Sequence, residues 1–151
     1  MKLAEALIER KAIKTKTEEL KKRIYQNSRI QEGDTSVEEP LSLISELRGE
    51  IEKLEKLIVR INQTNNTTKL SDDMTLMEAI VKKDMLNYLH MIHTNLADKA
   101  TPTTERYSRR EIKMVPGVEI GKIRKEADDI AKEYRLLDTK IQECNWKTEL
   151  I

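Results

Sequence analysis

Apolar residues recur at helical spacing in four segments, which predicts helices at about residues 2–31, 40–62, 75–99 and 118–144. In the second and fourth segments the apolar positions alternate steps of three and four residues without a slip. The second series is Ile44, Leu47, Ile51, Leu54, Ile58 and Ile61, and the fourth is Ile120, Ile123, Ala127, Ile130, Tyr134, Leu137, Ile141 and Cys144. This period of 3.5 residues is typical of helices that pack side by side along coiled-coil seams.

The first and third segments carry different patterns. The first seam is imperfect, because two of its positions are polar: Leu3, Ala6, Arg10, Ile13, Thr17, Leu20 and Ile24. The third segment begins with a capping box formed by Thr75 and Glu78. Its apolar residues cover most of the helix circumference, which predicts burial on several sides. One short chain can hardly supply that burial alone.

A non-helical arm is predicted at residues 101–116, between Pro102 and Pro116. Residues 111–115 alternate polar and apolar side chains like a short strand, and we find no second strand in the sequence to pair with it. The same segment of a second subunit could pair with it across a two-fold axis. Alternatively, the arm is an extended loop whose N–H groups bind water and side chains.

These patterns predict an all-α fold, as a single helical domain over residues 1–151. We expect an elongated bundle of four long helices with coiled-coil seams and one short extended or β arm between the third and fourth helices. The composition agrees, since 36% of residues are charged and only 3% are aromatic.

Charge and cysteine content bear on partners and location. The net charge of +1 gives no overall field to attract nucleic acid or an anionic membrane. We expect no signal peptide at the N-terminus and no membrane-spanning segment. The single cysteine, Cys144, cannot form an internal disulfide, so we expect a cytoplasmic protein.

Two histidines are the weak candidates for a metal site. His90 and His93 lie three residues apart on the third predicted helix and could face one ion. Zinc sites need three or four ligands, however, and no nearby pattern completes a set. We therefore interpret both as helix-face histidines held by hydrogen bonds, and expect no metal.

A basic cluster with one aromatic ring lies in the predicted arm. It comprises Arg106, Tyr107, Arg109, Arg110, Glu111 and Lys113. The arginines could contact phosphates while Tyr107 stacks on a base. The near-neutral net charge favours the alternative, in which the arginines pair with carboxylates of a neighbouring subunit.

The remaining candidates are interpreted as packing residues. Cys144 completes the fourth seam as a small, unreactive hydrophobe. Tyr134 and Trp146 are expected to anchor neighbouring helices. There is no glycine-rich phosphate loop, zinc-protease motif or nucleophile elbow, so we predict no enzyme activity and no cofactor.

Several segments spread along the whole chain resemble the septicolysin-like family of uncharacterised bacterial proteins. They are Met1–Leu7, Ile30–Gly33, Arg60–Asn62, Thr64–Asn65, Arg106–Arg109, Glu111–Lys113, Leu137–Gln142 and Asn145–Trp146. Arg110, where that family usually has Ser, and Cys144 depart from its pattern. The resemblance implies an all-helical fold that assembles into homo-oligomers, as a ring or a cluster of dimers, and implies no established activity.

The family name suggests a thiol-activated cytolysin, which the residues do not favour. Toxins of that kind share a Trp-rich loop beside a cysteine, whereas this chain offers one cysteine and one Trp in the run Glu143–Trp146.

The sequence therefore predicts a bacterial, cytoplasmic, non-catalytic scaffold or interaction protein that forms a homo-oligomer, either a dimer or a cluster of dimers. Nucleic-acid binding through residues 106–113 is the alternative, and membrane lysis is a third hypothesis supported only by the family name.

Overall fold

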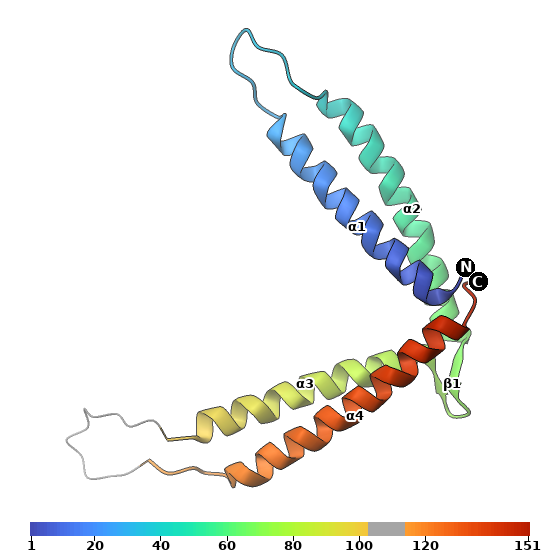
Figure 1. Ribbon diagram of the computed structural model, residues 1–151. Coiled ribbons are helices and arrows are strands. Elements are labelled where there is room, and N and C mark those ends of the chain that lie inside the picture. The colour runs from blue at the N-terminus through green and yellow to red at the C-terminus, as the bar shows by residue number, and fades with distance from the viewer. Residues whose placement is uncertain (103–113) are drawn as a thin grey trace, which may run out of the picture. The chain divides into compact units, whose positions relative to one another are not determined.

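The computed structural model describes residues 1–102 and 114–151, and it confirms the all-α prediction (Figure 1). The helices are α1 (Leu3–Gln26), α2 (Pro40–Thr67), α3 (Leu76–Ala100) and α4 (Ile120–Lys147). Two short strands, β1 (Lys69–Ser71) and β2 (Met74–Thr75), lie between α2 and α3. The chain divides into two compact units, one made of residues 1–69 and 142–151 and the other of residues 70–141.

The first unit is built on a hairpin of α1 and α2, which run side by side in opposite directions (Figure 1). All seven positions predicted for the α1 seam are buried or half-buried, including the polar Arg10 and Thr17. The ion pair between Arg23 and Glu38 joins the last turn of α1 to the far end of the connecting loop. In that loop Gly33 adopts a φ of 92°, a backbone conformation that side-chain-bearing residues rarely adopt.

The buried face of α2 is rotated from the face that the sequence predicts. Its buried residues are Leu43, Glu50, Leu57, Ile61 and Thr64. Of the six predicted positions, Ile61 is buried, Ile51 is exposed, and the others are half-buried: Ile44, Leu47, Leu54 and Ile58. The apolar stripe of α2 is wider than the surface that α1 covers, so apolar spacing alone does not fix which edge of the stripe packs inward.

The first two helices end at different residues from those predicted. The first stops at Gln26 rather than 31, because Asn27 Nδ2 donates to Arg23 O at 2.9 Å and Ser28 Oγ donates to Tyr25 O at 2.7 Å. Short polar side chains thereby satisfy the last carbonyls of the helix. The second continues past 62 to Thr67, since Thr64 is fully buried and tertiary packing outweighs weak helix propensity.

The β1–β2 hairpin is a feature that the sequence analysis missed. The two strands pair around the turn at Asp72 and Asp73. Strands of three and two residues are too short for an alternating pattern to develop. Of the strand predicted at 111–115, only Met114 and Val115 lie within the described residues, and both are exposed and irregular.

The second unit is built on α3 and α4, which also lie side by side (Figure 1). All eight predicted seam positions of α4, from Ile120 to Cys144, are buried or half-buried. The capping box at the start of α3 is present as predicted, with Glu78 N donating to Thr75 Oγ1 at 3.2 Å and Thr75 N donating to Glu78 Oε2 at 2.7 Å.

The two chain ends meet within the first unit. Leu3 N donates to Thr148 O and Leu150 N donates to Met1 O, both at 2.9 Å, as an isolated antiparallel bridge. Ile151 N donates to Thr64 Oγ1 at 3.1 Å, which ties the end of the chain to α2.

Candidate interaction surface on α3

The face of α3 that turns toward α4 carries mainly small and ionisable side chains. Eight of its buried and half-buried positions form a row with alternating steps of three and four, and Ile80 and Thr94 are half-buried beside that row. The eight are Leu76, Ala79, Lys83, Leu86, His90, His93, Ala97 and Ala100. Three of these eight are alanines and three are ionisable, so large apolar side chains are few on the face that packs within the chain.

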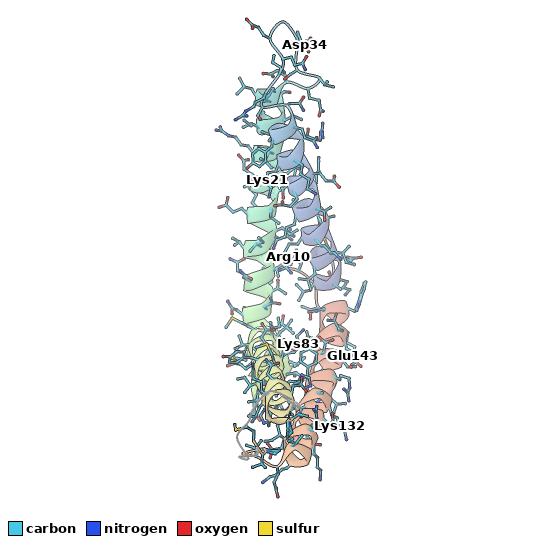
Figure 2. The ribbon with its side chains drawn as sticks, turned by 90° about the vertical axis from the view of Figure 1, so that its left-hand side faces the viewer. Arg10, Lys21, Asp34, Lys83, Lys132 and Glu143 are labelled. Atoms are coloured by element: carbon cyan, nitrogen blue, oxygen red, sulfur yellow. The ribbon has the colours of Figure 1, made fainter. Side chains whose placement is uncertain are left out.

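Several ion pairs connect α3 to α4. Lys83, labelled in Figure 2, donates to Asp138 Oδ1 at 2.8 Å, and its Nζ lies 5.9 Å from the centroid of the Tyr134 ring. Lys82 and Glu133 pair at 3.0 Å. Burial alone would lower the pKa of Lys83, but the hydrogen bond and charge of Asp138 raise that pKa overall.

The two candidate histidines lie on this inner face. His93 Nε2 is 3.3 Å from Glu126 Oε2, and its Nδ1 is 2.9 Å from Leu89 O. His90 is half-buried three residues earlier. Within residues 1–102 and 114–151, no three His, Cys, Asp or Glu side chains come together as metal ligands. The arrangement supports a packing role for His93, which bridges α3 to α4.

The candidates near the C-terminus lie in the first unit. Cys144 is half-buried, with its Sγ 3.6 Å from Thr148 Oγ1. The Trp146 side chain was expected to anchor a neighbouring helix, but it is 56% exposed. More than half of this side chain is therefore left uncovered by the described residues, and Trp146 stays a candidate for an interface.

The basic cluster of Arg106, Tyr107, Arg109, Arg110, Glu111 and Lys113 lies outside the described residues. Nucleic-acid binding through it, and its pairing with a neighbouring subunit, both stay predictions.

The opposite face of α3 exposes a continuous row of large apolar side chains, which we call the outer stripe. Its members are Met77, Val81, Met85, Tyr88, Ile92 and Leu96, each 39–57% exposed. Leu89 and Met91 flank it and are exposed as well. The sequence showed that α3 is apolar all round, but it could not show which side the other described residues leave uncovered.

The outer stripe is unusual for a surface. Single exposed apolar side chains are common, but contiguous apolar patches on soluble domains generally mark interaction sites. None of the helices in the described residues combines the length and the apolar run needed to cross a membrane.

Comparison with solved structures finds a relative with the same fold. A crystal structure of a functionally unknown conserved protein from Corynebacterium diphtheriae is similar at a TM-score of 0.93 and 41% sequence identity. The match covers 100% of this chain and 99% of that one. No curated protein matches the chain.

The family comparison corrects the resemblance drawn from the sequence. Residues 10–150 match the model of a family of unknown function, DUF6847, and not a septicolysin family. The shared segments are only two to seven residues long and did not discriminate between families. The lytic hypothesis, which rested on the septicolysin name, falls with it. The chain belongs to the DUF6847 family of unknown function.

Proposed function

We propose that this protein is a non-catalytic helical interaction protein that associates with copies of itself through the outer stripe of α3. The observation that carries the proposal is the reversal of α3, whose uncovered face is more apolar than its packed face. Burial of large apolar side chains is the dominant favourable term in protein association.

The length of the outer stripe suits a helix partner. From Met77 to Leu96 it spans 20 residues, and the first and last Cα atoms are about 28 Å apart along the helix. Six side chains in this row could enter the grooves of a facing helix, and each still has about half of its surface to bury. A second helix laid along α3 would complete the all-round burial that its sequence predicts.

The polar contacts of the second unit support a packing role over a catalytic one. Lys83 with Asp138, and His93 with Glu126, each join one helix to the other. Both contacts hold α3 against α4, which supports a scaffold role for these charged side chains. A cytosolic location belongs to the same proposal, because Cys144 has no disulfide partner.

The experiment is a mass measurement by light scattering on two variants. Val81→Glu combined with Ile92→Glu places two charges on the outer stripe. The control is Leu136→Glu, which alters an exposed apolar side chain on α4 in the same unit. Wild type and control should form a multiple of the 17.6 kDa chain, while the double variant should be a monomer at the same micromolar concentration.

The expected weakening of association is at least 100-fold, since burying two unpaired carboxylates is strongly unfavourable. Circular dichroism must show unchanged helix content in the double variant. A wild-type protein that stays monomeric at micromolar concentration contradicts the proposal.

A further inference from the structure

The outer stripe has a spacing that reads the same in both directions. Its residues, Met77, Val81, Met85, Tyr88, Ile92 and Leu96, follow one another in steps of four, four, three, four and four. A two-fold axis between Met85 and Tyr88 therefore maps the row onto itself. We infer that, in the proposed oligomer, α3 pairs antiparallel with α3 of a second copy about this axis.

The side chains that would meet across the axis are compatible in size and type. Met77 would face Leu96, and Val81 would face Ile92. At the centre Met85 would face Tyr88, a favourable contact between a thioether sulfur and an aromatic ring. Every layer of this arrangement joins one apolar side chain to another without placing two rings or two of the smallest residues together.

The charges at the ends of the stripe favour the same orientation. Asp72 and Asp73 lie exposed in the turn of the β1–β2 hairpin, shortly before α3. At the other end of α3, Asp98 is paired with Arg124 at 3.1 Å, and Lys99 lies exposed one turn beyond Leu96. Antiparallel pairing brings Lys99 of each copy toward Asp72 and Asp73 of the other, whereas parallel pairing places like charges together. Opposed helix dipoles add to this preference. These exposed charges decide orientation, while the apolar row supplies affinity.

A second copy fits this surface better than an unrelated helix for one reason. The outer stripe is complementary to itself in spacing, in side-chain type and in end charge, which is the requirement for an isologous interface. Binding to a different protein would not require the outer stripe to be complementary to itself. The inference rests on the proposed self-association and assigns its geometry.

Disulfide cross-linking tests the orientation. In a Cys144→Ser background, Met77→Cys and Leu96→Cys are made as separate proteins, one of them with a tag that changes its mass. A disulfide needs Cα atoms about 4.4–6.8 Å apart, and positions 77 and 96 are separated by about 28 Å along one helix. We expect rapid oxidation to a mixed dimer joining 77 to 96, and at least tenfold less cross-linking in either variant alone.

The possible failures are distinguishable. If each variant cross-links to itself, the helices pair in parallel and the inference is overturned while self-association stands. If the chain is a dimer by light scattering but neither arrangement cross-links, α3 is not the interface and the inference falls. If the wild-type chain is a monomer, the proposed function and the inference fail together. Leu136→Cys, on the outer side of α4, is the matched negative control and should cross-link with neither variant.

Discussion

At the scale of single residues, Glu50 is the least expected member of the core. It occupies the buried face of α2 and is only 7% exposed. Lys16 Nζ and Lys53 Nζ each donate to its Oε1 at 3.0 Å. A buried carboxylate is tolerated only when paired, so these two lysines allow α2 to turn this edge inward.

The charge of Glu50 should make stability depend on pH. Hydrogen bonds from Lys53 and then Lys16 hold the pKa of Glu50 below its usual range. When folding lowers the pKa of a carboxyl group, that group stabilises the folded state fully at any pH above its pKa in the unfolded chain. This stabilisation is lost as the pH falls through its pKa in the folded state. We expect Glu50→Gln to lower the melting temperature near neutral pH and to flatten its decline in acid.

Melting curves between neutral and acidic pH would measure this difference. Glu55→Gln, at an exposed position on the same helix, is the matched control and should follow the wild-type profile. Parallel pH profiles for wild type and Glu50→Gln would show that the two lysine contacts contribute nothing to stability.

At the scale of elements, the sequence was informative where a pattern had only one interpretation. The α4 series from Ile120 to Cys144 never slips, and all eight of its positions are buried or half-buried. The buried Asn145 lies outside that series and was not predicted. The capping box of α3 was equally clear. In α2 the apolar stripe was broad enough for either of its two edges to face inward. The spacing of apolar residues cannot show that Lys16 and Lys53 pair with Glu50 and so favour one edge.

The capping box gives a prediction with a known magnitude. Thr75→Ala removes the oxygen that accepts from Glu78 N, so the start of α3 loses a cap. The free energy of unfolding should fall by about 1 kcal/mol, within the range of about 0.5–2 kcal/mol for such substitutions. Urea denaturation would measure it.

A second threonine serves as the control for that experiment. Thr139→Ala lies inside α4, where the hydroxyl donates back to Arg135 O at 3.0 Å and caps nothing. Alanine is the better helix former there, so we expect stability to be unchanged or slightly higher. Equal losses for the two variants would contradict a capping role for Thr75.

At the scale of the whole molecule, the division into two compact units was beyond the reach of the sequence. A heptad-type seam shows that a helix has a partner but not which helix that partner is. The contacts that pair α1 with α2, and α3 with α4, join residues tens of positions apart, such as Lys16 with Glu50 and Lys83 with Asp138. Which face of α3 stays open depends on those pairings.

The contact between the two ends of the chain is a second feature that sequence patterns do not show. Leu150 is 8% exposed beside the bridge between Lys2 and Glu149, whereas its neighbour Ile151 is 59% exposed. We expect Leu150→Ala to reduce the free energy of unfolding by about 2–3 kcal/mol, as for other buried leucines. Ile151→Ala keeps the same backbone bonds and should change stability by less than about 0.5 kcal/mol.

Chemical denaturation of the two variants distinguishes a packed C-terminus from a frayed one. Near-wild-type stability of Leu150→Ala would mean that the last residues do not contribute to the first unit.

The reversal of α3 has a consequence for protein engineering. Ordinary practice chooses solvent-facing positions for labels, linkers or immobilisation, on the assumption that they tolerate change. On α3 that assumption selects Tyr88 and Ile92, which would behave like interior residues once a second copy covers them. Leu136, an exposed side chain on α4, is the safer attachment point. Ala79 and Ala97 on the packed side of α3 are fully buried and leave little room for larger side chains.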